Sequence, residues 1–188
     1  MVDNAIGTRS ANRITVVCQR KKVAPRMDAS LLDLLRQMHF SADLPEDVLE
    51  QVASVASLVD YPAGTVIFRE GSPPEQLLLI AKGRIALEMH VPGRGNVRIL
   101  SLCPGELAAW SSLVGSGPMT ASGVAIEDTQ VLALPAQRLR ALCDASPELG
   151  YLLMRRVGQA LANRLVATRL QLLDLFSDDP APVPLGTP

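Results

Sequence analysis

The side chains that most often carry catalysis are few in this sequence and lie far apart. Its two histidines, His39 and His90, do not stand in the HExxH spacing of a zinc peptidase or in another metal-ligand spacing. The three cysteines, Cys18, Cys103 and Cys143, form no CxxC pair, which argues against a zinc site or a disulfide framework. No GxSxG nucleophile elbow is present. The sequence therefore predicts a protein that is not an enzyme and holds neither a metal nor a cofactor.

Composition and charge narrow the class further. The chain has 188 residues, of which 48% are hydrophobic and 20% are charged, so it can bury one substantial core. A net charge of -1 lacks the basic excess of a nucleic-acid-binding domain, and we expect no DNA binding by this chain. Neither a signal peptide nor an apolar run of about 18–20 residues is present. These features predict a cytoplasmic protein that does not bind a membrane.

The two ends of the chain have the composition of tails. Residues 1–26 carry six basic residues and one acidic residue, a net charge of +5, with few apolar side chains. We expect a mobile basic tail there, either without a role or as an electrostatic dock for an acidic partner. Residues 177–188 contain four prolines, which end a helix and favour a second loose tail.

Between these tails the hydrophobic period changes twice, which predicts three structural parts. Residues 29–40 and the segment from Leu44 have helical spacing, and Pro45 with its following acids suits a first helical turn. From Leu58 onward, short apolar runs alternate with Gly- and Pro-containing turns, as in an antiparallel roll. We predict an α+β, mainly β fold: an eight-stranded antiparallel β-roll (jelly roll) flanked by N-terminal helices and a long C-terminal helix. The helices and roll occupy residues 27–145, and the long helix occupies residues 146–176.

The long terminal helix has a heptad seam. Apolar or small residues recur there with spacings of 4-3-4-3-4-3, at Met154, Gly158, Leu161, Leu165, Thr168, Leu172 and Leu175. A second apolar flank widens the stripe with Val157, Val166, Leu170, Leu173 and Phe176. The helix either packs only on its own roll, or packs one flank there and meets a second copy along the seam. We favour the second interpretation and predict a homodimer through Leu161, Leu165, Leu172 and Leu175.

Two segments at the start of the predicted roll carry a family pattern. The first reads Tyr61-Pro62-Ala63-Gly64-Thr65-Val66-Ile67-Phe68-Arg69-Glu70-Gly71, and the second is Leu77–Ile80 followed by Lys82-Gly83-Arg84. They resemble the opening strands and the next hairpin of the cyclic nucleotide-binding domain family. The resemblance covers roughly residues 30–176. The chain is similar to the sensor half of bacterial catabolite-activator-type regulators and to the paired domains of cyclic-AMP-dependent kinase regulatory subunits.

The resemblance implies a ligand site in one loop, the phosphate-binding cassette. In the family this loop reads Phe-Gly-Glu-Leu-Ala-Leu and, a few residues later, Pro-Arg-(Ser, Thr or Ala)-Ala. The glutamate accepts the ribose hydroxyl and the arginine pairs with the cyclic phosphate. Here Pro118-Met119-Thr120-Ala121 matches the end of the cassette, and Trp110 stands nine residues before Met119, at the glutamate position. In this alignment Gly105-Glu106 belongs to the preceding turn and is not the cassette.

Three cassette positions therefore depart from the family together: Ala109 replaces glycine, Trp110 replaces glutamate and Met119 replaces arginine. A buried anion without its partner costs about 3–5 kcal/mol, and a missing ribose acceptor costs roughly 1–3 kcal/mol more. At about 1.4 kcal/mol per tenfold, affinity falls by about three to five decades. The sequence predicts that cyclic AMP and cyclic GMP do not bind at physiological concentrations.

Three states of this site remain open from the sequence. In the first, Trp110 and Met119 fill a structural core. In the second, the site takes an apolar or weakly polar ligand, and Ser111, Ser112 and Thr120 form its polar lining. In the third, the site binds a nucleotide in an unusual mode. In the third case Arg94 or Arg169 would replace the lost charge. Thr168 matches a terminal-helix hydroxyl that contacts the base in catabolite-activator-type proteins, but it also fits as a tolerated polar residue of the seam.

The function predicted from the sequence is a stand-alone regulatory or sensor module. It would be dimeric and would act through an unidentified protein partner or another ligand. The alternative is a catabolite-activator-type transcription regulator, or a fragment of one, that binds a cyclic nucleotide in an unusual mode. Such regulators follow the terminal helix with a helix-turn-helix, whereas a proline-rich segment follows it here.

Overall fold

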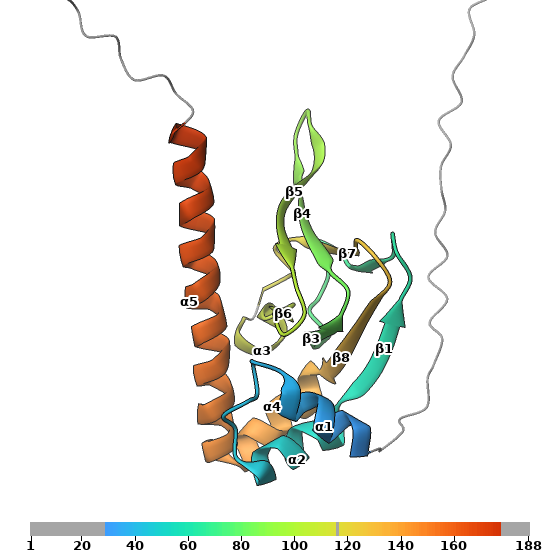
Figure 1. Ribbon diagram of the computed structural model, residues 1–188, viewed down its shortest axis with the longest axis vertical. Helices are drawn as coiled ribbons and strands as arrows, with labels where there is room; N and C mark the ends of the chain where they lie inside the picture. Colours follow the sequence, from blue (N-terminus) through green and yellow to red (C-terminus); the bar gives the residue numbers. More distant parts are fainter. Residues whose placement is uncertain (1–28, 116, 178–188) are drawn as a thin grey trace, which may run out of the picture.

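The computed structural model of the protein describes residues 29–115 and 117–177 (Figure 1). The predicted tail 1–26 and residues 178–188 of the predicted tail 177–188 lie outside the described residues, whereas Ser177 is the last residue of the final helix. The helices are α1 (Ala29–Gln37), α2 (Glu46–Val55), α3 (Ser111–Val114), α4 (Ala136–Ala145) and α5 (Pro147–Ser177). Within the described part of the chain, no helix is both long and apolar enough to cross a bilayer.

Eight strands form the roll. They are β1 (Ser57–Tyr61), β2 (Val66–Phe68), β3 (Gln76–Lys82), β4 (Ile85–Val91), β5 (Gly95–Leu102), β6 (Leu107–Ala108), β7 (Ser122–Ala125) and β8 (Thr129–Pro135). They pair antiparallel in two four-stranded sheets with the orders β1-β8-β3-β6 and β2-β7-β4-β5. The predicted fold class is confirmed, including the helices before the roll and the long helix after it.

The sheet β1-β8-β3-β6 is buried on both faces, which explains why β3 is apolar at four consecutive positions. Side chains alternate along a strand. Leu77 and Leu79 therefore enter a core on the helix side, while Leu78 and Ile80 enter a second core inside the roll. β8 follows the same pattern, because Leu132 and Leu134 join the helix-side core and its other apolar residues join the roll core. One sheet thus separates the two cores.

The helix-side core fixes how α4 and the start of α5 sit on the roll. Leu139 of α4 and Leu149 and Leu153 of α5 are fully buried against α1, α2 and the sheet. Figure 1 shows these helices gathered at one end of the roll, with α5 continuing past them alongside it. The start of α5 is therefore part of the domain core.

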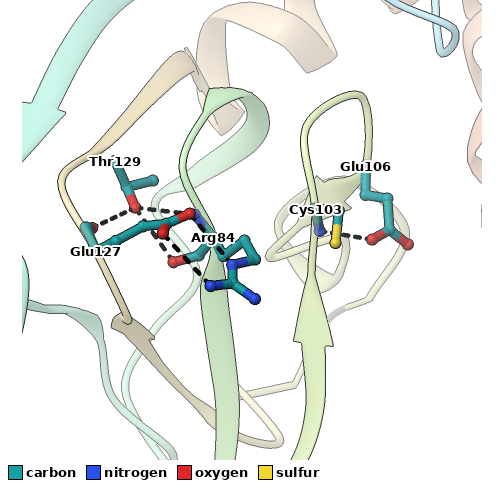
Figure 2. A network of polar contacts seen from close by, with 5 residues as sticks. All are labelled: Arg84, Cys103, Glu106, Glu127 and Thr129. Atoms are coloured by element: carbon teal, nitrogen blue, oxygen red, sulfur yellow. Dashed lines mark hydrogen bonds and ion pairs between the residues drawn. The ribbon is translucent and has the colours of Figure 1, made fainter.

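A tight turn after β3 holds the two sheets together at the opposite end. Gly83 has a φ of +82°, and an added Cβ would lie 2.6 Å from the carbonyl oxygen of Asp128 and 2.6 Å from Oγ1 of Thr129. Thr129 Oγ1 accepts the N–H of Arg84 at 3.2 Å, and the Arg84 guanidinium pairs with Glu127 at 3.2 Å (Figure 2). Only glycine fits a turn this close to the neighbouring chain.

Candidate functional site

The segment that aligns with the cassette begins as an edge strand and ends in a single helical turn. β6 pairs with β3, with Leu107 opposite Leu79 and Ala108 opposite Leu78. Ala109 follows with a φ of +58°, in the left-handed region where a residue with a side chain costs about 1–2 kcal/mol relative to the usual backbone conformation. Ala109 stands where the alignment places the family's glycine. Trp110 then has helical dihedrals and leads into α3.

Glu106 has a structural task in the preceding turn. The carbonyl of Ile80 accepts the N–H of Gly105 at 2.8 Å, and Gly105 has a φ of +85°. Oε2 of Glu106 accepts the backbone N–H of Cys103 at 2.7 Å, so the carboxylate is bonded to its own turn (Figure 2). The side chain is exposed. These contacts agree with the alignment that leaves Gly105-Glu106 out of the cassette.

Met119, at the position of the family's arginine, lies inside the roll. Its side chain is 5% exposed and packs with Ala108 and Ala109 in the roll core. The loop around it is tied down by two backbone hydrogen bonds of 2.8 Å, from Met119 to Ser72 and from Gly71 to Met119. The thioether accepts the hydroxyl of Ser111 at 3.1 Å. A thioether is a weak acceptor and carries no charge, so Met119 cannot balance a phosphate.

Trp110, at the position of the family's glutamate, faces the other core. Its indole is half-buried and packs against the helix-side core, to which Leu107 and Leu113 also belong. Met119 belongs to the roll core. The two residues that the sequence placed together in one filled pocket therefore contribute to different cores.

The predicted hydroxyls do not form one polar patch. Ser111 is buried and donates to Met119, as described above, while Thr120 is exposed. Ser112 is fully buried, and its hydroxyl has no hydrogen-bond partner among the described residues. Thr168 is exposed and donates to the carbonyl of Arg164 at 2.9 Å, one helical turn earlier. Its hydroxyl is thus used within α5.

Two arginines that the sequence analysis did not single out contact this segment. Arg164 of α5 donates from Nη2 to the carbonyl of Leu107 at 2.6 Å, and Arg140 of α4 donates from Nε to the carbonyl of Ser112 at 3.1 Å. Burial lowers the pKa of Arg164. The sequence contains one indication of this role. Arg164 lies at a helical spacing from Leu153 and Val157, so a charged side chain continues a stripe that is otherwise apolar and buried.

The two arginines proposed as replacements for the lost charge lie elsewhere on the surface. Arg94 is in the exposed turn between β4 and β5, where its N–H donates to the carbonyl of Val91 at 3.0 Å. Arg169 is exposed on α5. Two hollows of the surface share Lys82 and Asp128, and none of residues 107–120 lines either of them. The described residues contain no group of three metal-ligating side chains.

The apolar residues that the sequence assigns to the seam of α5 and to its flank divide between two environments. Leu161 is half-buried and packs against the helix-side core. Leu165, Val166 and Leu170 are 53%, 55% and 58% exposed. The side chains of the last two predicted contact residues, Leu172 and Leu175, lie outside the described set.

Comparison with known proteins identifies the family. The profile of the family described as "Cyclic nucleotide-binding domain" matches residues 58–146. A solved chain from Geobacter metallireducens, named as a candidate cyclic nucleotide-binding protein, is 30% identical with a TM-score of 0.64, and the match covers 71% of this chain and 96% of that one. The protein belongs to the cyclic nucleotide-binding domain family.

Within this family, its relatives include bacterial regulators. A CRP-like cAMP-activated global transcriptional regulator of Mycobacterium tuberculosis is 32% identical over 127 residues, which are 66% of this chain and 54% of the relative. The cyclic AMP receptor protein of Thermus thermophilus is 38% identical over 122 residues, which are 64% of this chain and 54% of the relative. The chain spans about half the length of these curated relatives.

Proposed function

We propose that this domain is a non-enzymatic regulatory module that does not bind cyclic AMP or cyclic GMP in the family's usual mode. The observation that carries the proposal is Met119, which is buried in the apolar roll core where the family places its phosphate-binding arginine. A phosphate there would lose its hydration without gaining a cation, which costs about 3–5 kcal/mol. Trp110 supplies no carboxylate for the ribose.

Isothermal titration calorimetry with each nucleotide tests this directly. We expect no binding heat up to about a millimolar, and a dissociation constant at or below about ten micromolar would contradict the proposal. The nucleotides are added to protein purified without them, and bound material is checked by native mass spectrometry.

A double variant tests whether the site lost its function residue by residue. Trp110→Glu with Met119→Arg restores the two charged groups and is expected to bind cyclic AMP if the rest of the pocket is preserved. Trp110→Gln with Met119→Leu is the matched control, because it changes the same positions without adding charge. If the charged variant folds but does not bind cyclic AMP, the pocket differs from the family's at further positions or is closed.

We also propose that the module is a homodimer through α5. The helix runs on past the other helices (Figure 1), and its Leu165, Val166 and Leu170 are more than half exposed. Gly158 lies on an open face of the same helix, because an added Cβ there would meet no atom within 4 Å. Heptad spacing and a position without a side chain both favour the close approach of a second helix.

Sedimentation velocity tests the dimer. Leu165→Asp places a charge in the proposed interface and is expected to give folded monomers, since an unpaired buried charge costs about 3–5 kcal/mol. Asn163→Asp adds the same charge to an exposed position of α5 outside the seam and should leave the dimer intact. A wild-type protein that sediments as a monomer at tens of micromolar would contradict the proposal.

A second candidate is a catabolite-activator-type transcription regulator that binds a cyclic nucleotide in an unusual mode. Two observations favour it. Both bacterial relatives are named for cyclic AMP, and the part that matches this chain is 54% of the length of each relative. The calorimetry described above separates the two candidates. Binding near or below about ten micromolar with Trp110 and Met119 in place would favour this second function.

A further inference from the structure

Residues 107–113 are bonded to both C-terminal helices, and the bonds come from two arginines. We propose that Arg140 and Arg164 are positioning residues that hold this segment against α4 and α5 without a ligand. The inference rests on the proposed function only in taking this segment to hold no cyclic nucleotide. Its experiment measures the mobility of that segment and not ligand binding, so the two proposals can fail separately.

Arg164 satisfies a carbonyl that the sheet leaves open. β6 is the last strand in the order β1-β8-β3-β6, and an edge strand has backbone groups without a strand partner. Nη2 of Arg164 donates to the carbonyl of Leu107 in that strand at 2.6 Å. Arg164 is half-buried and its Nε has no hydrogen-bond partner among the described residues, so the side chain has given up hydration to make this contact.

Arg140 satisfies a carbonyl at the other end of the segment. α3 is four residues long, and the last carbonyls of a helix have no partner within it. Nε and Nη2 of Arg140 both donate to the carbonyl of Ser112, the former at 3.1 Å. Hydrogen bonds from a charged donor are among the stronger ones in proteins. The short helix is therefore joined to α4.

The segment between the two carbonyls has little freedom left. It contains the left-handed Ala109 and the half-buried Trp110, and the hydroxyl of Ser111 is bonded to Met119. A loop of this kind would otherwise open locally at a small free-energy cost. With both ends bonded to helices, a movement of α5 relative to the roll must break the Arg164 contact or carry β6 with it. Arg164 thus couples the segment to α5, the helix proposed to form the dimer, and Arg140 couples it to α4.

Amide hydrogen exchange of the full chain, measured without nucleotide, tests the coupling. Arg140→Met and Arg164→Met each remove the donors while keeping an unbranched side chain. We expect the amides of residues 107–113 to exchange about ten- to a hundredfold faster in each variant, the change that corresponds to losing a charge-assisted hydrogen bond. Trp110 is the only tryptophan of the chain, and acrylamide should quench its fluorescence more strongly in both variants.

Two exposed arginines of the same helices provide the controls. Arg138→Met in α4 and Arg155→Met in α5 remove a charge of the same kind and should leave exchange and quenching as in the wild type. Arg140→Lys and Arg164→Lys retain a charged donor and should recover part of the protection. If Arg164→Met does not fold, the smaller change of Arg164→Lys is compared with wild type. If the amides of residues 107–113 exchange within about twofold of the wild-type rate in the folded Arg140→Met and Arg164→Met variants, the proposal is wrong.

Discussion

The two halves of α5 have similar sequences but different surroundings. In the first half, Leu149, Leu153 and Val157 are fully buried in the helix-side core. In the second half, Leu165, Val166 and Leu170 have the same apolar character, yet more than half of each side chain is exposed. The change comes within one turn, at the half-buried Leu161 and Arg164.

This difference shows that an apolar stripe on a helix does not identify what covers it. The first half of α5 is covered by α1, α2, α4 and the sheet, whereas the second half runs beyond them (Figure 1). Heptad spacing continues through both halves because it depends only on the helix itself. The contribution of each half to stability and to association can therefore be measured separately.

The largest expected effect concerns the buried half. Leu153→Ala removes a fully buried side chain and should lower the free energy of unfolding by about 2–5 kcal/mol. Leu165→Ala is the matched change in the exposed half, and in the monomer it should cost less than about 0.5 kcal/mol. Chemical denaturation at several protein concentrations measures both. If Leu165 also contributes to a dimer, the loss of unfolding free energy in Leu165→Ala depends on protein concentration. Equal losses in the two variants that do not depend on protein concentration would contradict the comparison.

A smaller effect is expected at Gly158, on the open face between the two halves. Gly158→Ala should raise the free energy of unfolding of the monomer by about 0.5–1 kcal/mol, because alanine favours the helix and its Cβ meets no atom within 4 Å. Gly158→Leu should fold equally well but weaken the dimer, since the larger side chain keeps a second helix away. Thermal unfolding and sedimentation are measured on the same samples. Unchanged association of Gly158→Leu would place the dimer contact elsewhere.

The smallest expected effect is a pH dependence at the first half of α5. Arg156 donates to the carboxylate of Asp43 at 2.5 Å, and this bond lowers the pKa of Asp43. A lowered folded-state pKa means that the pair stabilises the fold above the ordinary pKa of an aspartate, and that this contribution is lost as the pH falls through the lowered value. Arg156→Gln should raise the pKa of Asp43 in an NMR titration.

The neighbouring Arg155 provides the control for that titration. It lowers the pKa of Asp43 only through its charge and less strongly than Arg156 does. Arg155→Gln should therefore shift the Asp43 titration less than Arg156→Gln. Equal shifts would mean that charge alone, and not the hydrogen bond, sets the pKa.

Most elements of the fold could be predicted from local patterns. The helical spacing before Leu58, the short strands after it and the return of helical spacing after Pro135 all correspond to observed elements. The two-residue strand β6 and the turn α3 had no such signal, because two and four residues are too few to show a period. These short elements position the candidate site.

The sequence proposes which residues make up the candidate site, but it does not give their arrangement. Ala109, Trp110 and Met119 can be read as replacements from the alignment alone. Which core each side chain enters depends on how the sheet that contains β6 packs between the helices and the interior of the roll. The contacts of Arg140 and Arg164 with carbonyl groups could not be predicted either, since a backbone carbonyl has no sequence signature and the partners are 28 and 57 residues apart.

The sequence by itself determined the family pattern and the order of the elements, and it is the source of the prediction that both charged cassette residues are replaced. These features depend on residue type and on spacing along the chain, which packing does not change. Only the tertiary structure decided that Trp110 and Met119 enter different cores, that two arginines bond residues 107–113 to the C-terminal helices, and where along α5 burial ends. Each of these depends on surfaces that are distant in sequence and meet only when the sheet and helices pack.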